Sequence, residues 1–575
     1  MLPKVVVTTL LFAVFAAPAS AGRVSLMPRV TYERQVQFTP HGPVVVHILR
    51  APKPTGLYAL RPLLSNDSLL GRETVTSMQR RASASANVAG VNGDFWTWDE
   101  GIPTGMLMQS GVLQTPPHPQ RSSLGVTDDG SLLVGRVSML GQWQGSGPIR
   151  ALNGLNQRPG AQGVSLFTPV WGAATPRASG TVEVVLAPFP PTAPATELVG
   201  LVTQITTGGG TRIPRGGAVL VARGSAANRL AAEAAIGENM LVKLFLRPNW
   251  AAVVDAIGGG PVIVRDGQPV FQALEDFSSS QLGPRDPRTG VGQLADGRLV
   301  FVVVDGRQPG YSVGVTNFEL AQMLVRLGAV TGTALDSGGS STMAFNGKLL
   351  NRPSDSGGVR AVGDALTLFY YGVIAPAPTQ PVLSPNGDGV AETQTLGFKV
   401  VRPSTVTRSL IGPDGLPHLT QTDGRNPGTY RMTWSGRTPT GTEPEGRWRW
   451  VVDALDDTGQ HSRVERRFYL NRTLGYLRVR PSRVVVRRRR GASLRVRFRL
   501  AHPATVTVTV RNARGTQVRT IRRRLGTGWK TIRWDGRYGN GDRAFSGRYI
   551  ARVQTANAFG PAELERRFFV RRARH

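Results

Sequence analysis

The sequence contains no cysteine, and this absence excludes several kinds of bond and site. The chain can form no disulfide, no thiolate metal ligand and no cysteine nucleophile. Histidine is also scarce: of the seven, none lies between His118 and His418. A Ser-His-Asp triad in that central region would need an imidazole from a distant segment, so we do not expect one. Candidate chemistry there must come from carboxylates, hydroxyls and arginines.

Long apolar runs are absent apart from one near the start. The run from Val5 to Ala17 follows Lys4 and precedes Ala19-Ser20-Ala21, a small-residue cleavage pattern. This is typical of a secretory signal peptide over residues 1–21, cleaved after Ala21. The run is too short to span a bilayer comfortably, so we expect no transmembrane segment. The predicted location is secreted, or at the cell surface or envelope.

Acidic residues are rare in the last hundred residues. From Arg472 to His575 there are 27 Arg and one Lys against four acids, which is +24 of the formal net charge of +32. Much of this segment alternates Arg with apolar residues, a pattern that lines one sheet face with guanidinium groups. We expect it to attach to an anionic envelope polymer. The alternative is a solvated face in an arginine-rich proteome, and a nucleic-acid partner conflicts with the signal peptide.

The length of 575 residues allows two to four domains. A Pro-rich linker, 373–381, separates a first domain at 22–372 from a repeated region. In that region Trp434-Ser435-Gly436-Arg437 recurs as Trp534-Asp535-Gly536-Arg537, and the offset of about 100 residues suits one sandwich per copy. The predicted fold is therefore multi-domain. It has an N-terminal strand-rich α/β domain with a mixed sheet, followed by two all-β Ig-like sandwiches at 382–471 and 472–575.

The two C-terminal copies resemble the Ig-like modules of flagellar hook-capping proteins and of many bacterial surface proteins. That resemblance implies a spacer or binding role rather than catalysis. In the first of them, Ser384 to Glu392 resembles a calcium loop of such surface modules, with Asn386, Asp388 and Glu392 as the candidate ligands. A tight Asx and Gly turn is the alternative.

Within the first domain, the segment from Thr316 to Gly328 predicts a helix. Thr316 and Glu319 have the spacing of a capping box, and the apolar residues share one face. Glu73 to Ala89 also has the length and residue types of a helix, and Leu299 to Val304 suits a buried central strand.

A glycine-rich stretch, Leu335 to Met343, follows this helix after a short β-type run. It contains Asp336, two glycines and two serines in succession. Glycines let the backbone approach a ligand closely, and N–H groups with hydroxyls suit an anion. A glycine-rich turn between two strands is the ordinary alternative.

Four further short stretches are candidates for chemistry, and several follow predicted strands, where ligands collect in open α/β sheets. Each also has an ordinary interpretation as a turn dipeptide, a helix cap, a surface arginine or a core tryptophan. They are Asn92-Gly93-Asp94-Phe95-Trp96, Pro287-Arg288-Thr289, Asp305-Gly306-Arg307 and Glu319.

Taken together, these motifs resemble the phosphodiester glycosidase family, which includes the animal lysosomal uncovering enzyme. The resemblance covers Val44 to Tyr371 and is densest at Pro287 to Gly292 and from Val302 to Met343. It implies cleavage of a sugar from a phosphodiester. One departure is Ser337, which takes a position where the family has glycine. If that position requires positive φ, Ser337 should strain or alter the turn.

A phosphodiester monoanion suits a planar bidentate donor, here Arg288, together with neutral donors. The neutral donors would be Thr289, Ser340, Ser341 and the backbone of Gly338 and Gly339; Asn92, Asp305 and Arg307 complete the predicted substrate-binding set.

Glycoside cleavage needs paired carboxyl groups, one ionised and one protonated in turn. We expect Asp336 and Glu319 nearest the chemistry, followed by Asp94, with the roles of acid, base and nucleophile left open. No cofactor is certain, although such a carboxylate group could also hold Mg²⁺ or Ca²⁺.

The sequence thus predicts a secreted hydrolase of glycosyl phosphodiester (sugar-1-phosphate ester) linkages in envelope or extracellular polysaccharide. The alternative is a non-catalytic polysaccharide-binding or exopolysaccharide-assembly surface protein. A third hypothesis makes the basic tail primary and the protein an envelope adhesin.

Overall fold

The structure is a computed structural model that describes residues 19–20, 22–271, 273–438, 441–487 and 492–573. Almost all of the predicted signal peptide lies outside these described residues. The chain divides into two compact units, Met1–Tyr371 and Gly372–His575, and each is described by itself. None of the helices in the described ranges is long and apolar enough to cross a membrane.

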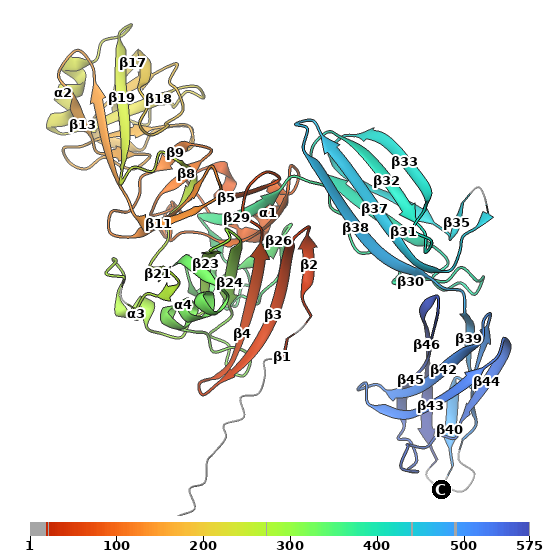
Figure 1. Cartoon of the computed structure of the whole chain (residues 1–575). Coiled ribbons are helices and arrows are strands. Elements are labelled where there is room, and N and C mark those ends of the chain that lie inside the picture. The colour runs from red at the N-terminus through yellow and green to blue at the C-terminus, as the bar shows by residue number, and fades with distance from the viewer. Residues whose placement is uncertain (1–18, 21, 272, 439–440, 488–491, 574–575) are drawn as a thin grey trace, which may run out of the picture. The chain divides into compact units, whose positions relative to one another are not determined.

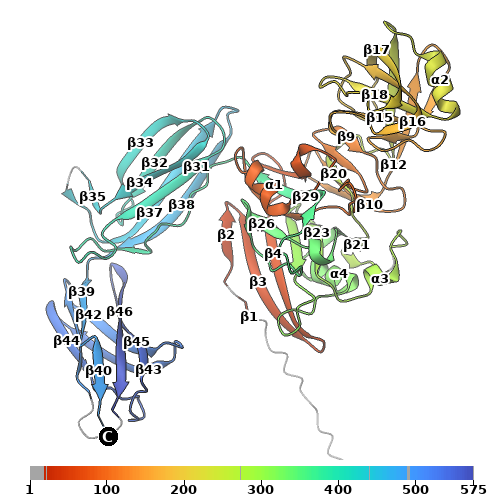
Figure 2. The same cartoon turned by 180° about the vertical axis from the view of Figure 1, so that it is seen from behind.

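The first unit is built on a nine-stranded sheet (Figures 1 and 2). Strand β24, predicted to be central and buried, lies between β4 and β23 and is buried along its whole length. The strand order is β1 (Ala19–Ser20), β3 (Val30–Thr39), β4 (Gly42–Ala51), β24 (Leu299–Val304), β23 (Arg288–Leu294), β25 (Ala329–Ala334), β21 (Val262–Arg265) and β22 (Gln268–Pro269), with β2 (Val24–Met27) paired to β3.

Helix α4 (Asn317–Arg326) packs on this sheet, as its apolar face predicts. Thr316 and Glu319 form the predicted capping box, each side chain accepting the other's backbone N–H. Glycine on the sheet makes room for the helix, since a Cβ on Gly290 would lie 3.0 Å from the side chain of Leu320. The helix therefore sits close to the strands that lead into the candidate site.

A second sheet of five strands packs against helix α1 (Val75–Ala82). The prediction of a helix through Ala89 is wrong in its second half, because residues 87–92 form strand β7. All six residues of β7 are buried between two partner strands, and this sheet pairing outweighs local helix propensity. The strand order is β27 (Lys348–Leu349), β26 (Met343–Phe345), β7 (Asn87–Asn92), β29 (Asp364–Tyr370) and β5 (Tyr58–Leu64).

Two more sheets lie between β7 and β21 in the sequence. One has the order β11 (Leu132–Arg136), β10 (Ser122–Thr127), β20 (Val253–Ile257), β8 (Leu107–Gln109) and β9 (Val112–Thr115). The other has the order β13 (Arg150–Leu152), β12 (Ser138–Gln144), β19 (Asn239–Arg247), β17 (Leu198–Gly209), β16 (Arg177–Leu186), β18 (Ala218–Arg223), β15 (Val164–Phe167) and β14 (Gly154–Leu155).

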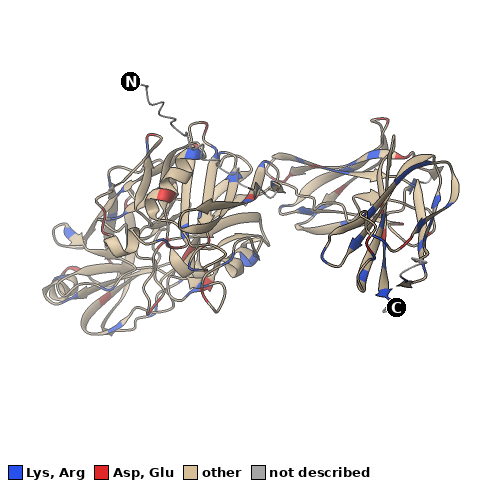
Figure 3. Cartoon of the chain, turned by 90° about the horizontal axis from the view of Figure 1, so that it is seen from below, with Lys and Arg blue, Asp and Glu red and all other residues tan. Residues whose placement is uncertain are grey.

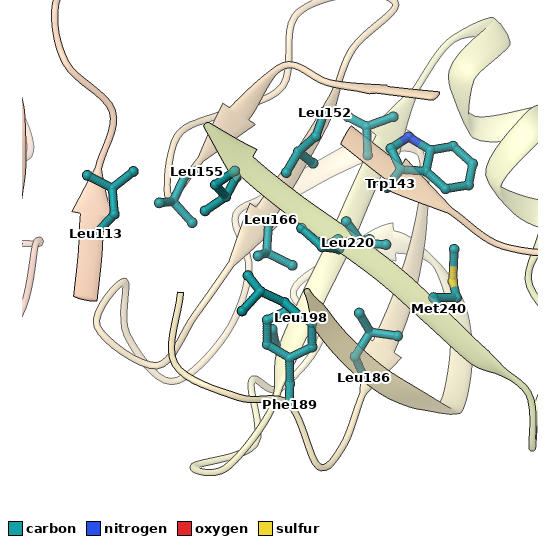
Figure 4. Close-up of a cluster of buried hydrophobic side chains, with 14 of the residues drawn as sticks. Leu113, Trp143, Leu152, Leu155, Leu166, Leu186, Phe189, Leu198, Leu220 and Met240 are labelled. Atoms are coloured by element: carbon teal, nitrogen blue, oxygen red, sulfur yellow. The ribbon is translucent and has the colours of Figure 1, made fainter. Parts of the chain in front are cut away.

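The eight-stranded sheet has a large core, which Figure 4 shows around Trp143, Leu166 and Leu220. Helix α2 (Ser225–Glu233) covers part of it through Leu230. The same core includes Met108, Leu113 and Val253 of the five-stranded sheet, so these two sheets share one core.

The second unit contains the two predicted β-sandwiches. The first pairs a sheet of β30 (Val382–Leu383), β38 (His461–Leu470), β37 (Gly446–Asp456), β32 (Ser404–Ile411) and β33 (Pro417–Arg425) with β31 (Gln394–Val400) and β34 (Gly428–Trp434). The second pairs β39 (Leu474–Arg480), β41 (Leu494–Leu500) and β44 (Gly528–Trp534) with β40 (Arg483–Val486), β46 (Gly560–Arg572), β45 (Gly547–Asn557), β42 (Ala504–Asn512) and β43 (Gln517–Leu525).

The sequence repeat corresponds to a repeated contact. The indole N–H of Trp434 donates to the carbonyl of Arg437 at 2.9 Å, and Trp534 donates to Arg537 at the same distance. Within the segment predicted as a linker, Val373 is buried in the core of the first sandwich.

Candidate functional site

Three aspartates from three separate strands meet where the two main sheets of the first unit adjoin. Asp94 follows β7, Asp336 follows β25 and Asp364 begins β29. Gly93 joins them through its backbone: its carbonyl accepts from the N–H of Asp336 at 3.0 Å, and its N–H donates to the carbonyl of Asp364 at 3.1 Å. The N–H of Asp94 donates to Asp364 Oδ1 at 2.7 Å. The sheets therefore gather carboxylates that lie up to 270 residues apart.

Asp94 is held in a cradle of glycines. Its Oδ1 accepts from the N–H of Phe95 at 2.7 Å, and its Oδ2 accepts from the N–H of Gly105 at 2.6 Å. A Cβ on Gly258 would lie 2.3 Å from Oδ2, so only glycine fits against this carboxylate. Burial raises the pKa of Asp94 to about 7, although the two N–H donors and nearby Arg121 act to lower it. Both protonation states are therefore accessible near neutral pH.

Asp364 is the member of the cluster that the sequence did not reveal. It is fully buried, and its Oδ2 has no hydrogen-bond partner among the described protein atoms. Burial raises the pKa of Asp364 well above its usual range, and the charges of Asp94 and Asp336 raise it further. Its protonated form is thus favoured. No local motif marks it, because Gly363-Asp364 follows an ordinary loop and only the pairing of β29 with β7 places it beside Asp94.

Asp336 is the partly exposed carboxylate of the three. Its Oδ1 accepts from the N–H of Ser337 at 2.8 Å. Burial raises the pKa of Asp336 to about 6, against the lowering effects of the Ser340 hydroxyl, Arg360 and the Trp96 side chain. Of the three carboxyl groups it is the one exposed to solvent, and its place nearest the chemistry stays a prediction.

The turn after Asp336 carries three consecutive buried hydroxyls. The Ser340 hydroxyl lies beside the Asp336 carboxylate, and those of Ser341 and Thr342 make no hydrogen bond within the described structure, although these residues are at most 1% exposed. Unpaired buried hydroxyls are costly, so a group that satisfies them is expected at a functional site. Ser337 has φ −121° and Gly338 has φ +66°, so glycine occupies the left-handed position and Ser337 is not strained.

Two guanidinium groups flank this turn. A Cβ on Gly338 would lie 3.1 Å from both Nη atoms of Arg307, and a Cβ on Gly339 would lie 2.1 Å from Nη2 of Arg360. Arg307 donates through Nε and Nη2 to Asp286 at 2.7 and 3.0 Å.

Arg360 is held in the same way by Asp355, at 2.7 and 2.9 Å. Each guanidinium is thus fixed by a carboxylate, while its Nη1 donates no hydrogen bond to the described residues. Arg307 was predicted from its motif, whereas Arg360 was missed because it lies in a loop with no recognisable spacing.

Arg288 does not have the geometry of the predicted phosphate donor. Its guanidinium makes five hydrogen bonds: to the carbonyls of Val315, Gln281, Leu282 and Pro284, and to the Ser337 hydroxyl. The side chain is buried, and burial lowers its pKa to about 10. Because all five N–H groups of Arg288 are used, its guanidinium holds the loops around the turn and has no N–H group left for a phosphate.

Asn92 and Thr289 are likewise internal supports rather than exposed binding groups. Asn92 Nδ2 donates to the carbonyl of Asp336 at 2.8 Å. Its Oδ1 accepts from the Thr289 hydroxyl at 2.8 Å and from the Thr342 N–H at 3.0 Å. Both residues are fully buried, so they position the strand end that carries Asp336.

Glu319 is occupied by the helix cap. Its Oε2 accepts from the N–H of Thr316 at 2.9 Å, and Oε1 is paired with Arg285. Although burial acts to raise it, these contacts leave the pKa of Glu319 lowered. No contact in the described structure joins it to the aspartate cluster, so the geometry favours Asp364 over Glu319 as the third carboxyl group.

Asp305 is the centre of a second buried network. It accepts from His47 at 2.9 Å, Tyr311 at 2.9 Å and Asn351 at 3.0 Å. Asn351 also donates to the carbonyl of Ser341 at 3.0 Å. Asp305 therefore supports the hydroxyl turn from behind instead of binding substrate directly.

The predicted calcium loop has the contacts of a closed turn. Glu392 Oε1 accepts from the N–H groups of Gly387 and Gly389, and Asp388 Oδ1 accepts from Val390. Asn386 Oδ1 accepts from the Asp388 N–H. Among the residues that the structure describes, no set of three or more His, Cys, Asp or Glu side chains is arranged to hold a metal ion.

Two segments match known families, as the resemblances predicted. Residues 196–369 match the phosphodiester glycosidase family, and residues 484–558 match the FlgD Ig-like domain. The first segment contains the hydroxyl turn, Asp336 and Asp364, and the second lies in the strongly basic sandwich.

Curated relatives match over short stretches. The SPbeta prophage-derived uncharacterized protein YomE of Bacillus subtilis (strain 168) is 37% identical over 108 residues, which is 19% of this chain and 16% of that protein. The N-acetylglucosamine-1-phosphodiester alpha-N-acetylglucosaminidase of Bos taurus is 40% identical over 68 residues, 12% of each protein. The chain thus matches less than a fifth of the length of either relative.

A solved structure shares the fold. The crystal structure of a hypothetical protein from Synechocystis has a TM-score of 0.52 and 24% identity, covering 62% of this chain and 64% of that chain. At this identity the likeness concerns fold alone.

Proposed function

We propose that this chain, which carries a phosphodiester glycosidase domain, hydrolyses glycosyl phosphodiesters at the aspartate cluster of its first unit. The observation that carries the proposal is one arrangement: three carboxyl groups with raised pKa values beside a glycine turn flanked by two guanidinium groups. The turn suits a phosphodiester anion, and the carboxyls suit proton transfer to and from the glycosidic bond.

Phosphate recognition is assigned to Arg307 and Arg360. Each is exposed or partly exposed, and each is oriented by a bidentate aspartate, so little side-chain freedom would be lost on binding. Absence of a side chain on Gly338 and Gly339 lets the two guanidinium groups lie against the backbone of the turn. The Ser340 hydroxyl lies beside Asp336, and the unpaired hydroxyl of Ser341 supplies a neutral donor.

Proton transfer is assigned to Asp336, with Asp94 and Asp364 behind it. Because the pKa values of Asp336 and Asp94 lie at about 6 and about 7, the cluster holds a mixture of protonated and ionised carboxyls near neutral pH. Asp336 contacts the substrate because it is the partly exposed member. Because its pKa is raised, Asp364 stays protonated, and this limits the total negative charge of the cluster.

A sugar ring would find an aromatic surface beside the anion donors. Trp98 is 70% exposed, and the guanidinium of Arg360 lies 5.7 Å from its ring centroid. Trp96 beneath it is buried, with the two ring centroids 4.6 Å apart. We assign Trp98 to the sugar and Arg360 to the adjoining phosphate.

The proposed setting is outside the cell, acting on envelope or extracellular polysaccharide. The signal-peptide pattern of residues 1–21 supports this location, and the sandwich domains would hold the enzyme near its polymer.

The test is release of free sugar from a panel of α- and β-linked sugar-1-phosphodiesters. Asp336→Asn should reduce turnover by about 10²-fold or more, since positioned acid–base groups typically contribute that much. Asp296→Asn is the matched control, because Asp296 is exposed and pairs with its own neighbour Arg298. If the wild type binds the esters and releases no sugar from any of them, the enzyme proposal fails and the non-catalytic polysaccharide-binding function replaces it.

A further inference from the structure

The outer face of the three-stranded sheet in the second sandwich is densely cationic. Strands β39, β41 and β44 alternate buried and exposed residues, and their exposed positions carry mainly arginine. Figure 3 shows more Lys and Arg than Asp and Glu along the strands near the C-terminus. We call this the arginine face; it consists of Arg478, Arg480, Arg495, Arg497, Arg499 and Arg533, with Trp529.

Strand register places these arginines in rows across the sheet. Arg495 of β41 lies between Arg480 of β39 and Arg533 of β44. Arg497 pairs with Arg478 in the next row on the same face. Neighbouring strands lie about 4.8 Å apart and alternate residues about 7 Å apart along a strand, so the charges form a compact lattice. Like charges directly opposite each other destabilise a sheet, and this arrangement therefore lacks a folding advantage.

No carboxylate of this sandwich compensates the arginine face. Its four acids lie elsewhere: Asp535 and Asp542 in the turn after β44, and Glu563 and Glu565 on β46. None of the six arginines forms an ion pair within the described ranges. The opposite sheet differs, because Arg552 there pairs with both Glu563 and Glu565. Arginines without an ion pair within the described ranges also lie on the opposite sheet, at Arg522 and Arg524 of β43. What distinguishes the arginine face is that its arginines lie directly opposite one another on neighbouring strands.

An exposed aromatic ring adjoins the charged rows. Trp529 is 45% exposed, lies opposite Arg499, and has the guanidinium of Arg497 4.3 Å from its ring centroid. Tyr476 flanks it, with ring centroids 5.9 Å apart. An indole fixed among guanidinium groups offers a flat apolar surface to a sugar ring next to phosphate donors.

We propose that the arginine face binds a linear polymer of sugars joined by phosphodiesters, with the arginines on its phosphates and Trp529 on a sugar. The positive charge of the arginine face favours a polyanion. The exposed ring of Trp529 beside the arginines favours a polyanion in which charged groups alternate with sugar rings. The choice of a sugar-phosphate polymer rests on the proposed function of the first unit, whose substrate it would tether. Binding itself needs no catalysis.

The experiment uses the full chain carrying Asp336→Asn, so that the polymer stays intact. The probe is a capsular polysaccharide built of hexosamine-1-phosphate repeats, titrated at physiological salt. Arg495→Gln, Arg497→Gln and Arg533→Gln together should weaken binding about tenfold, because three exposed ionic contacts of modest strength add to roughly that factor. A matched triple variant removes the same charge away from this face, through Arg514→Gln, Arg522→Gln and Arg524→Gln, and should change binding less than about twofold.

Competing partners are distinguished by further probes. Neutral dextran should not bind, and inorganic polyphosphate should bind without sensitivity to Trp529→Ala, which should weaken only the sugar polymer. If both triple variants lost polymer binding equally, the proposal would be overturned, because binding would then depend on net charge and not on the arginine face. Tighter binding of duplex DNA, or of phosphatidylglycerol vesicles, than of the sugar polymer would overturn the assigned partner. Failure of the wild-type chain to release sugar, with polymer binding retained, would refute the enzyme proposal alone.

A stability readout separates a binding face from a structural one. Without polymer, Arg495→Gln should raise Tm, because it removes the central charge of a row of three. Polymer should raise the Tm of the chain with an intact face and raise that of the arginine-face triple variant less. A lower Tm for Arg495→Gln, with unchanged polymer binding, would show that the row serves folding and would refute the proposal.

Discussion

Replacing Arg288 by lysine distinguishes a structural guanidinium from a substrate ligand. Arg288 donates five hydrogen bonds, four of them to carbonyls of residues 281–284 and 315. A lysine ammonium has three N–H groups on one atom, so at least two of these acceptors lose their donor. Each buried acceptor left unpaired costs about 1–3 kcal/mol, which gives a loss of about 2–6 kcal/mol.

That loss is a large part of the roughly 5–15 kcal/mol that stabilises a typical domain. We expect Arg288→Lys to lower Tm on the order of 10 °C in thermal unfolding followed by circular dichroism. The KM of the variant that remains folded should change little. Arg298→Lys is the control, because Arg298 is exposed and its surface pair with Asp296 is worth at most about 1 kcal/mol. An unchanged Tm with a raised KM for phosphodiesters would refute this reasoning and restore Arg288 as the phosphate donor.

Three further predictions concern the site. Burial raises the pKa of Asp94 to about 7, so the stabilisation that its proton provides is complete below about pH 4 and is lost as pH rises to about 7. Asp94→Asn should therefore flatten the fall in Tm between about pH 4 and pH 7, and an unchanged slope would contradict the raised pKa. Arg307→Gln and Arg360→Gln should each raise the KM for a sugar-1-phosphodiester about tenfold in steady-state kinetics, with Tm within a few degrees of wild type. A large drop in Tm would instead show that these arginines are structural. Gly258→Ala places a Cβ 2.3 Å from the Asp94 carboxylate and should lower both Tm and kcat. Gly216→Ala is the control, because Gly216 also lacks a positive φ and has open space around it, so it tests the backbone cost alone.

Features that depend on neighbouring residues were predictable from the sequence. The capped helix α4 follows from a box of four residues and an apolar stripe, both of which are local. The repeat of sandwich domains follows from tryptophans and glycines that recur at one offset, and both copies use their tryptophan in the same contact. Glycine at 338, rather than residue 337, takes the left-handed conformation, which the position of the two glycines allows.

The assignment of roles to charged side chains needed the tertiary structure. Arg288 and Arg307 both lie in motifs. The N–H groups of Arg288 donate to backbone carbonyls, whereas Arg307 pairs with Asp286 through Nε and Nη2 and keeps Nη1 free of hydrogen bonds to the described residues. Their difference depends on how the preceding loop folds back, because Gln281 and Pro284 lie 7 and 4 residues before Arg288 while Asp286 lies 21 residues before Arg307. Neither motif shows this difference. The same holds for the end of α1, where pairing of β7 with two distant strands stops a helix that local propensity would continue.

The sequence by itself determined that an acid, two glycines and consecutive hydroxyls would form one turn, because these residues are adjacent. Only the tertiary structure decided which carboxylates join that turn. Glu319 is sequestered by its own helix cap, while Asp364 reaches Asp94 through the register of β29 on β7. A carboxyl group's role follows from its burial and its partners, and both are set by strands that meet only when the chain has folded.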